Sequence, residues 1–108
     1  MEGKEKLINK YRLGLAIQAI INENKSGMKE NAIMSLRKLA AASGVEYSII
    51  QKISSGQKDP QFTTILSLAD GLNISIIELL SYFEKITEQV AIKKMNESLK
   101  KSKRRKTK

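Results

Sequence analysis

The sequence of 108 residues contains no cysteine and no histidine. Their absence excludes disulfides, thiolate nucleophiles, imidazole bases and the most common zinc ligands. The few carboxylates fall mostly on predicted helix surfaces, and no glycine-rich loop is suited to cradle a phosphate. We therefore expect no enzyme activity, no cofactor and no metal site.

Proline, glycine and aromatic residues are also scarce, with one Pro, six Gly, three Tyr, two Phe and no Trp. No segment alternates β-branched and polar residues between turn signals, so strands are not predicted. No apolar run approaches the roughly 20 residues that span a bilayer, and residues 1–10 lack the apolar stretch of a signal peptide. We expect an all-α, cytoplasmic protein with an aliphatic core and no membrane contact.

The net charge of +9 is unevenly distributed. Residues 1–92 hold 11 Lys and Arg against 10 Asp and Glu, whereas residues 93–108 hold nine against Glu97 alone. Residues 100–108, the basic tail, have no apolar side chain to bury, so we expect them to be disordered. The tail could follow a DNA backbone, bind RNA or only aid solubility, because Lys and Arg attract any polyanion. Its basic residues are Lys100, Lys101, Lys103, Arg104, Arg105, Lys106 and Lys108.

The spacing of apolar residues predicts five helices and an additional C-terminal helix. They cover about residues 4–23, 35–42, 46–54, 61–71 and 75 onward, with the last helix reaching about residue 99, either separate from the fifth or continuous with it. We expect a domain over residues 1–82, a C-terminal helix over 83–99 and the tail over 100–108. Buried candidates in the fifth helix are Ile76, Ile77, Leu79 and Leu80.

The apolar residues of the segment 83–99 have two interpretations. They either cover the core of the domain or pair with a second copy across a two-fold axis. We assign Phe83 and Ile86 to the core, because they are close to the five-helix body. Val90, Ile92 and Met95 extend beyond that body and are the candidates for a dimer interface.

Residues 35–56 have the pattern of two short helices that cross at a tight turn. Ser35 fits the N-cap of the first helix, and Gly44 can end that helix in a left-handed conformation. Ala40 is small where the helices approach each other. Leu39, Ile50 and Ile53 have the spacing of core residues, so the segment predicts a compact bihelical unit.

This pattern, together with the following GQKDP, ILSLADGLNI and SIIELL segments, resembles the phage repressor, Cro and XRE family of helix-turn-helix DNA-binding domains. The resemblance covers roughly residues 35–80 and rests on Leu-Ala, Ser-Gly-Val, Ile-x-x-Ile, Gly and Asp-Pro in the expected order. It implies a five-helix repressor-like fold, double-stranded DNA as partner and a homodimer. It also implies the cytoplasm of a bacterium or of a phage-infected cell.

The resemblance places the third helix in the major groove, with base contacts from Tyr47, Ser48 and Lys52. Lys52 can donate to guanine O6 or N7, and Ser48 can donate or accept. The same three residues could instead form the solvated face of an amphipathic helix. Backbone or marginal contacts are implied for Arg37, Lys38, Ile49, Gln51, Gln57 and Lys58.

We therefore expect a sequence-specific, double-stranded DNA-binding transcriptional regulator that acts as a homodimer. One alternative is an antitoxin-like interaction protein whose C-terminal helix and tail bind a protein partner such as a toxin. The other is a sequence-nonspecific nucleic-acid-binding protein that acts through its basic tail.

Overall fold

The computed structural model describes residues 1–27 and 32–106, with side chains up to Lys101, so Lys108 and the side chains of residues 102–106 lie outside the described part. The described residues form helices and no strands, which confirms the all-α prediction. The helices are α1 (Gly3–Gly27), α2 (Leu36–Ser43), α3 (Tyr47–Ser54), α4 (Phe62–Gly71), α5 (Ile76–Lys85) and α6 (Glu88–Lys106).

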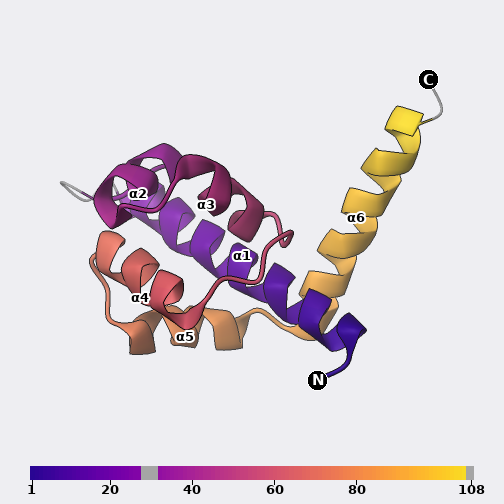
Figure 1. Ribbon diagram of the computed structural model, residues 1–108, viewed down its shortest axis with the longest axis horizontal. Helices are drawn as coiled ribbons and strands as arrows, with labels where there is room; N and C mark the ends of the chain where they lie inside the picture. The colour runs from indigo at the N-terminus through magenta and orange to yellow at the C-terminus, as the bar shows by residue number, and fades with distance from the viewer. Residues whose placement is uncertain (28–31, 107–108) are drawn as a thin grey trace.

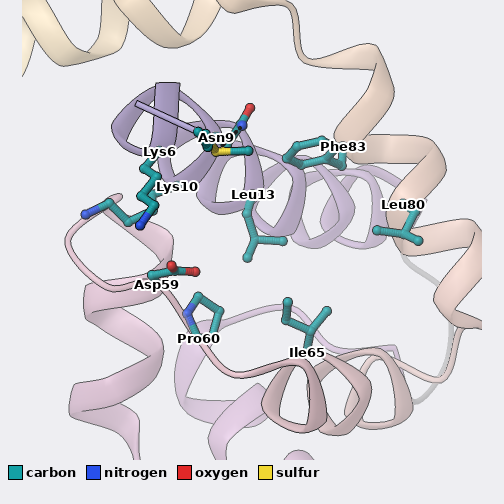
Figure 2. A pocket seen from close by; sticks show the side chains of 10 residues that line it. Lys6, Asn9, Lys10, Leu13, Asp59, Pro60, Ile65, Leu80 and Phe83 are labelled. Carbon is teal, nitrogen blue, oxygen red and sulfur yellow. Dashed lines mark hydrogen bonds between the residues drawn. The ribbon is translucent and has the colours of Figure 1, made fainter. Parts of the chain in front are cut away.

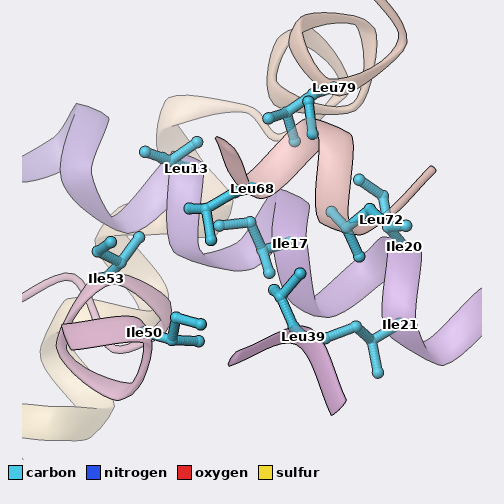
Figure 3. Close-up of a cluster of buried hydrophobic side chains, with 11 residues drawn as sticks. Leu13, Ile17, Ile20, Ile21, Leu39, Ile50, Ile53, Leu68, Leu72 and Leu79 are labelled. Atoms are coloured by element: carbon cyan, nitrogen blue, oxygen red, sulfur yellow. The ribbon is translucent and has the colours of Figure 1, made fainter. Parts of the chain in front are cut away.

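The long helix α1 is the centre of the molecule (Figure 1). In the view of Figure 1, α2 and α3 lie on one side of α1, and α4 and α5 lie on the other. Helix α1 packs against α3, α5 and α6, while α2 packs directly against α4. Side chains from α1 to α5 meet in one aliphatic core (Figure 3). The apolar stripe of α1 is buried there, and it consists of Leu13, Ala16, Ile17, Ile20 and Ile21.

Local signals set the ends of α2 and the start of α5. The hydroxyl of Ser35 accepts a hydrogen bond from the Lys38 amide at 3.1 Å, and the hydroxyl of Ser75 accepts one from the Glu78 amide at 3.1 Å. Gly44 ends α2 with a φ of 75°, in the left-handed region that glycine adopts at low cost. The sequence predicted the cap at Ser35, the turn at Gly44 and a helix beginning near residue 75.

Two of the four residues predicted to be buried in α5 are exposed. Leu79 is fully buried and Ile76 packs against the core, but Ile77 and Leu80 are 76% and 45% exposed. The prediction was wrong because only one stripe of α5, with Ile76, Leu79 and Phe83 at helical spacing, faces the rest of the molecule.

A break at residues 86–87 separates α5 from α6, so the two helices are not continuous. Arg12 of α1 explains the break, because its Nε donates to the carbonyl of Ile86 at 2.6 Å and its Nη2 to the carbonyl of Phe83 at 3.3 Å. Its guanidinium also lies 4.1 Å from the centre of the Phe83 ring. Arg12 thus bonds carbonyls that helical amides would bond if α5 continued.

Helix α6 continues to Lys106, so the expectation that residues 100–106 are disordered was wrong. The helical segment expected over 83–99 is instead the end of α5 followed by α6. Lys and Arg are good helix formers, and extending an existing helix costs far less than starting one. Ala91, which is fully buried, fixes the first turns of α6 against the body.

Within the described residues, no single helix is long and apolar enough to cross a membrane. Only α4 and α5 taken together reach that length and composition, and they are bent by 100° relative to each other.

Candidate nucleic-acid interface

The outer face of α3 carries the polar residues that the sequence assigned to DNA. Ile50 and Ile53 are buried under α3, whereas Ser48, Gln51 and Lys52 are exposed. Ser48 and Lys52 are four residues apart and therefore lie one turn apart on the same face. The helix has eight residues, so this face is about 12 Å long.

Tyr47 has a packing role that the sequence did not reveal. The guanidinium carbon of Arg37 lies 4.3 Å from the centre of the Tyr47 ring, which links the first turns of α2 and α3 by a cation–π contact. The ring is half-buried at a surface hollow of about 390 Å³, which also borders α1. Part of Tyr47 is thus used inside the protein, and its remaining surface is available to a ligand.

Cations lie beside both ends of α3. Arg37 and Lys38 are exposed in the first turn of α2, where helix amides also favour an anion. Gln57 and Lys58 are exposed in the segment that follows α3. Ile49 is the exception among the predicted contact residues, because it packs partly against the core.

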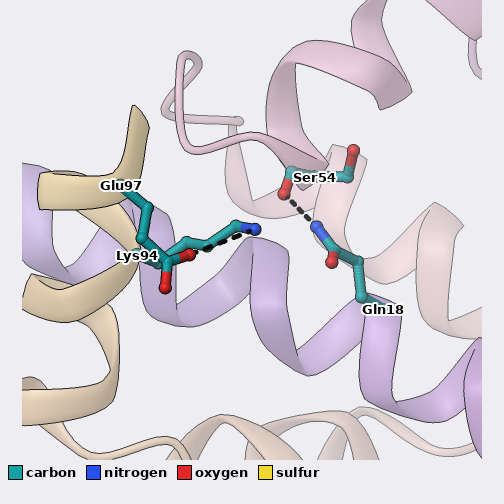
Figure 4. Close-up of polar contacts among 4 residues, drawn as sticks. All are labelled: Gln18, Ser54, Lys94 and Glu97. Carbon is teal, nitrogen blue, oxygen red and sulfur yellow. Dashed lines mark hydrogen bonds and ion pairs between the residues drawn. The ribbon is translucent and has the colours of Figure 1, made fainter. Parts of the chain in front are cut away.

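Helix α1 supports the C-terminal end of α3 at very short range. Gln18 Nε2 donates to the carbonyl of Ser54 at 2.6 Å (Figure 4). A methyl group on Gly14 would lie 2.5 Å from the same carbonyl oxygen and 2.7 Å from that of Ile53. Neither contact was predicted from the sequence, although a glycine inside a long apolar helix is itself a signal of close backbone approach.

A separate surface cavity of about 410 Å³ lies between α1, α4, α5 and the segment before α4 (Figure 2). Its lining is mainly apolar, with Lys6, Lys10 and Asp59 toward one end. In the part of the chain with described side chains, no three carboxylate, thiol or imidazole groups are placed to hold a metal ion.

Comparison with protein families finds a match that includes the bihelical unit α2–α3. A family model described as helix-turn-helix matches residues 28–79, which include α2, α3, α4 and the start of α5. Comparison with curated proteins and with solved structures finds no match. The match agrees with the observed N-cap at Ser35 and the turn at Gly44. The match over residues 28–79 supports the resemblance of this segment to the DNA-binding helix-turn-helix domains of the phage repressor, Cro and XRE family.

Proposed function

We propose that the protein is a transcriptional regulator that recognises a specific operator in double-stranded DNA. The observation that carries the proposal is the exposed polar face of α3, formed by Ser48, Gln51 and Lys52. An α-helix of this size fits the major groove of B-DNA. The exposed cations of α2 and of the segment after α3 flank that face and can hold the two phosphate backbones.

Each residue of the face has a defined role in this proposal. Lys52 donates to guanine O6 or N7, and Ser48 contacts a base edge one turn earlier on the helix. Tyr47 presents its phenol at the edge of the groove while Arg37 holds its ring. Arg37 and Lys38 bind phosphate and fix the orientation of α3.

We further propose that the regulator binds as a homodimer. A single α3 reads only a few base pairs, and two-fold dimers of such domains read half-sites about 34 Å apart. Of the residues expected at the interface, Val90 is 49% exposed, while Ile92 and Met95 are half-buried. Exposed apolar surface is also present on α4 and α5, where Phe62 is 62% exposed.

The test begins by selecting bound duplexes from a random pool and then measures Lys52→Ala on the selected operator. We expect the loss of a base contact to weaken operator binding by about 1 to 3 kcal/mol, or about 5- to 150-fold. Binding to random duplex should change little. Lys85→Ala is the matched control, since this lysine lies at the end of α5, on the other side of α1.

An equal loss on random duplex would reassign Lys52 to phosphate contact. Failure of the wild-type protein to select any sequence would contradict operator recognition altogether. That second result would favour sequence-nonspecific binding through the basic tail. The supporting observation is that residues 1–92 have a net charge of only +1, so most of the positive charge lies in residues 93–108.

A further inference from the structure

Helix α6 crosses from one side of the molecule to the other. It begins on the side of α4 and α5, passes the N-terminal half of α1 and ends on the side that carries α2 and α3 (Figure 1). Ala91 is fully buried at this crossing. The position of α6 is therefore fixed by packing.

The middle of α6 lies beside the C-terminal end of α3. Lys94 and Ser98 line a small cavity of about 120 Å³ together with Ser54 and Ser55, which end α3. Figure 4 shows Lys94 across from the Gln18–Ser54 hydrogen bond that ties α3 to α1. The end of the helix that is proposed to read DNA and the middle of the basic helix thus border the same cavity.

Beyond Ser98, α6 leaves the body. Leu99 is 60% exposed, and Lys100 and Lys101 are exposed. The helix continues to Lys106, which adds eight residues or roughly 12 Å at 1.5 Å per residue. The projecting part of α6 is therefore a short rod on the same side of α1 as α3.

The projecting part carries positive charge without acidic neighbours along the chain. No acidic residue follows Glu97 in the sequence. Glu97 itself lies 3.9 Å from Lys94 in a half-exposed ion pair, which contributes little to stability. The basic residues of the rod are Lys100, Lys101, Lys103, Arg104, Arg105 and Lys106.

We propose that the projecting part of α6, residues 99–106, is a second DNA-contacting element that binds phosphates beside the groove occupied by α3. The proposal rests on the proposed recognition of DNA by α3. Each strand of duplex DNA presents one negative charge per about 3.4 Å of the helix axis, so a rod of roughly 12 Å along one strand spans about three to four phosphates. Because the rod is anchored at Ala91, it contacts one fixed flank of each half-site instead of sampling both.

The position of the projecting part of α6 on DNA is tested with a DNA-cleaving reagent attached at a single residue. The chain has no cysteine, so Leu99→Cys provides one attachment point for a metal chelate that cleaves nearby DNA. We expect cuts in one flank of each half-site on the operator selected by the wild-type protein. Ile77→Cys is the matched control, because this residue is 76% exposed on α5 and should give no cuts.

The contribution of the α6 cations to phosphate binding is tested by the salt dependence of operator binding. The double variant Lys100→Gln, Lys101→Gln removes two cations, and Lys4→Gln, Lys85→Gln removes two elsewhere. Each lost phosphate contact lowers the slope of log K against log salt by about 0.9. We therefore expect the affinity loss of the first variant between 50 and 200 mM salt to be about 12-fold smaller than that of the wild type. The second variant should match the wild type.

The two measurements separate this proposal from operator recognition. Unchanged salt dependence together with absent or evenly spread cuts would overturn the role of α6. If Lys52→Ala still weakened specific binding, operator recognition by α3 would stand. Reduced binding of a single-stranded RNA probe by the Lys100/Lys101 variant, with operator binding unchanged, would also overturn the proposal and assign the rod to RNA.

Discussion

Two side chains of α1 hold the C-terminal ends of other helices. Gln18 donates to the last turn of α3, and Arg12 donates to the last turn of α5. The final carbonyls of a helix lack intrahelical partners, so a side-chain donor from elsewhere satisfies them. One helix thereby fixes where the proposed recognition helix ends and where the chain leaves α5.

Gly14 is the residue at which a small substitution should have a large effect. In Gly14→Ala, the new methyl group would lie 2.5 Å from the Ser54 carbonyl oxygen, so α1 and α3 must move apart. We expect the free energy of unfolding to fall by about 1 to 3 kcal/mol in urea denaturation. Gly3→Ala is the control, since a methyl group there meets nothing within 4 Å. Equal stability of the two variants would show that the contact is loose.

The hydroxyl of Tyr82 donates a hydrogen bond to the carboxylate of Glu23, which links α5 to α1. This bond, with partial burial and the charges of Glu23 and Glu78, raises the pKa of Tyr82 above its ordinary value of 10.0. The raised pKa means that folding favours the neutral phenol. This contribution to stability is complete below pH 10 and is lost as the pH rises through the folded-state pKa.

Glu23→Gln should lower the pKa of Tyr82 toward its ordinary value, because the variant removes the charge that opposes ionisation. An NMR titration of the Tyr82 ring measures the shift. Glu5→Gln, at an exposed position in the first turn of α1, should leave that titration unchanged. A Tyr82 titration that is the same in all three proteins would show that the bond does not persist in solution.

Residue-level prediction from the sequence succeeded where the signal was local. The N-cap at Ser35 and the turn at Gly44 each depend on a few neighbouring residues. Arg12 could not be predicted in the same way, because its partner Ile86 is 74 positions away. Of the predicted base-contact residues, Ser48 and Lys52 are exposed on α3 and Tyr47 is half-buried. Their contacts with DNA remain a prediction.

At the scale of the elements, the break between α5 and α6 depends on Arg12. In Arg12→Ala, the Ile86 carbonyl loses its side-chain donor, the Phe83 carbonyl keeps only the Ile86 amide, and the Phe83 ring loses its stacking partner. We expect a loss of about 1 to 3 kcal/mol in unfolding free energy, the usual cost of losing hydrogen bonds from a charged donor. Amide hydrogen exchange in α6 should also become faster, because α6 starts from this junction.

Lys4→Ala is the control for Arg12→Ala, since Lys4 is an exposed residue of the same helix. Arg12→Lys should be intermediate, because an ammonium keeps the charge but lacks the guanidinium fork. Unchanged exchange in α6 with Arg12→Ala would mean that packing at Ala91 alone fixes this helix.

The order and approximate limits of the helices were predictable, but the break at residues 86–87 was not. The apolar spacing runs through the break without interruption, from Phe83 to Ile86 and Val90. The end of α6 was also missed, because a run of basic residues suggests disorder when considered alone. The structure extends a helix into that run from an anchored start at Ala91.

For the whole molecule, the proposed homodimer predicts sensitivity to the spacing between half-sites. Rigid two-fold dimers require half-sites on the same face of the duplex, one helical turn of about 10 to 10.5 base pairs apart or a multiple of this spacing. Inserting about five base pairs into the selected operator should therefore weaken binding at least tenfold in a titration. Inserting about ten should weaken it less. Equal affinity for all three duplexes would indicate that single copies bind independently.

The central position of α1 also determines which fragments of the protein can fold when they are expressed alone. The segment that matches the helix-turn-helix family begins at residue 28, after α1 has ended. A fragment trimmed to that segment would leave Leu39, Ile50 and Leu68 facing water, because Ile17 and the rest of the α1 stripe cover them. The smallest piece that can be expressed as a stable unit therefore starts well upstream of the recognisable motif.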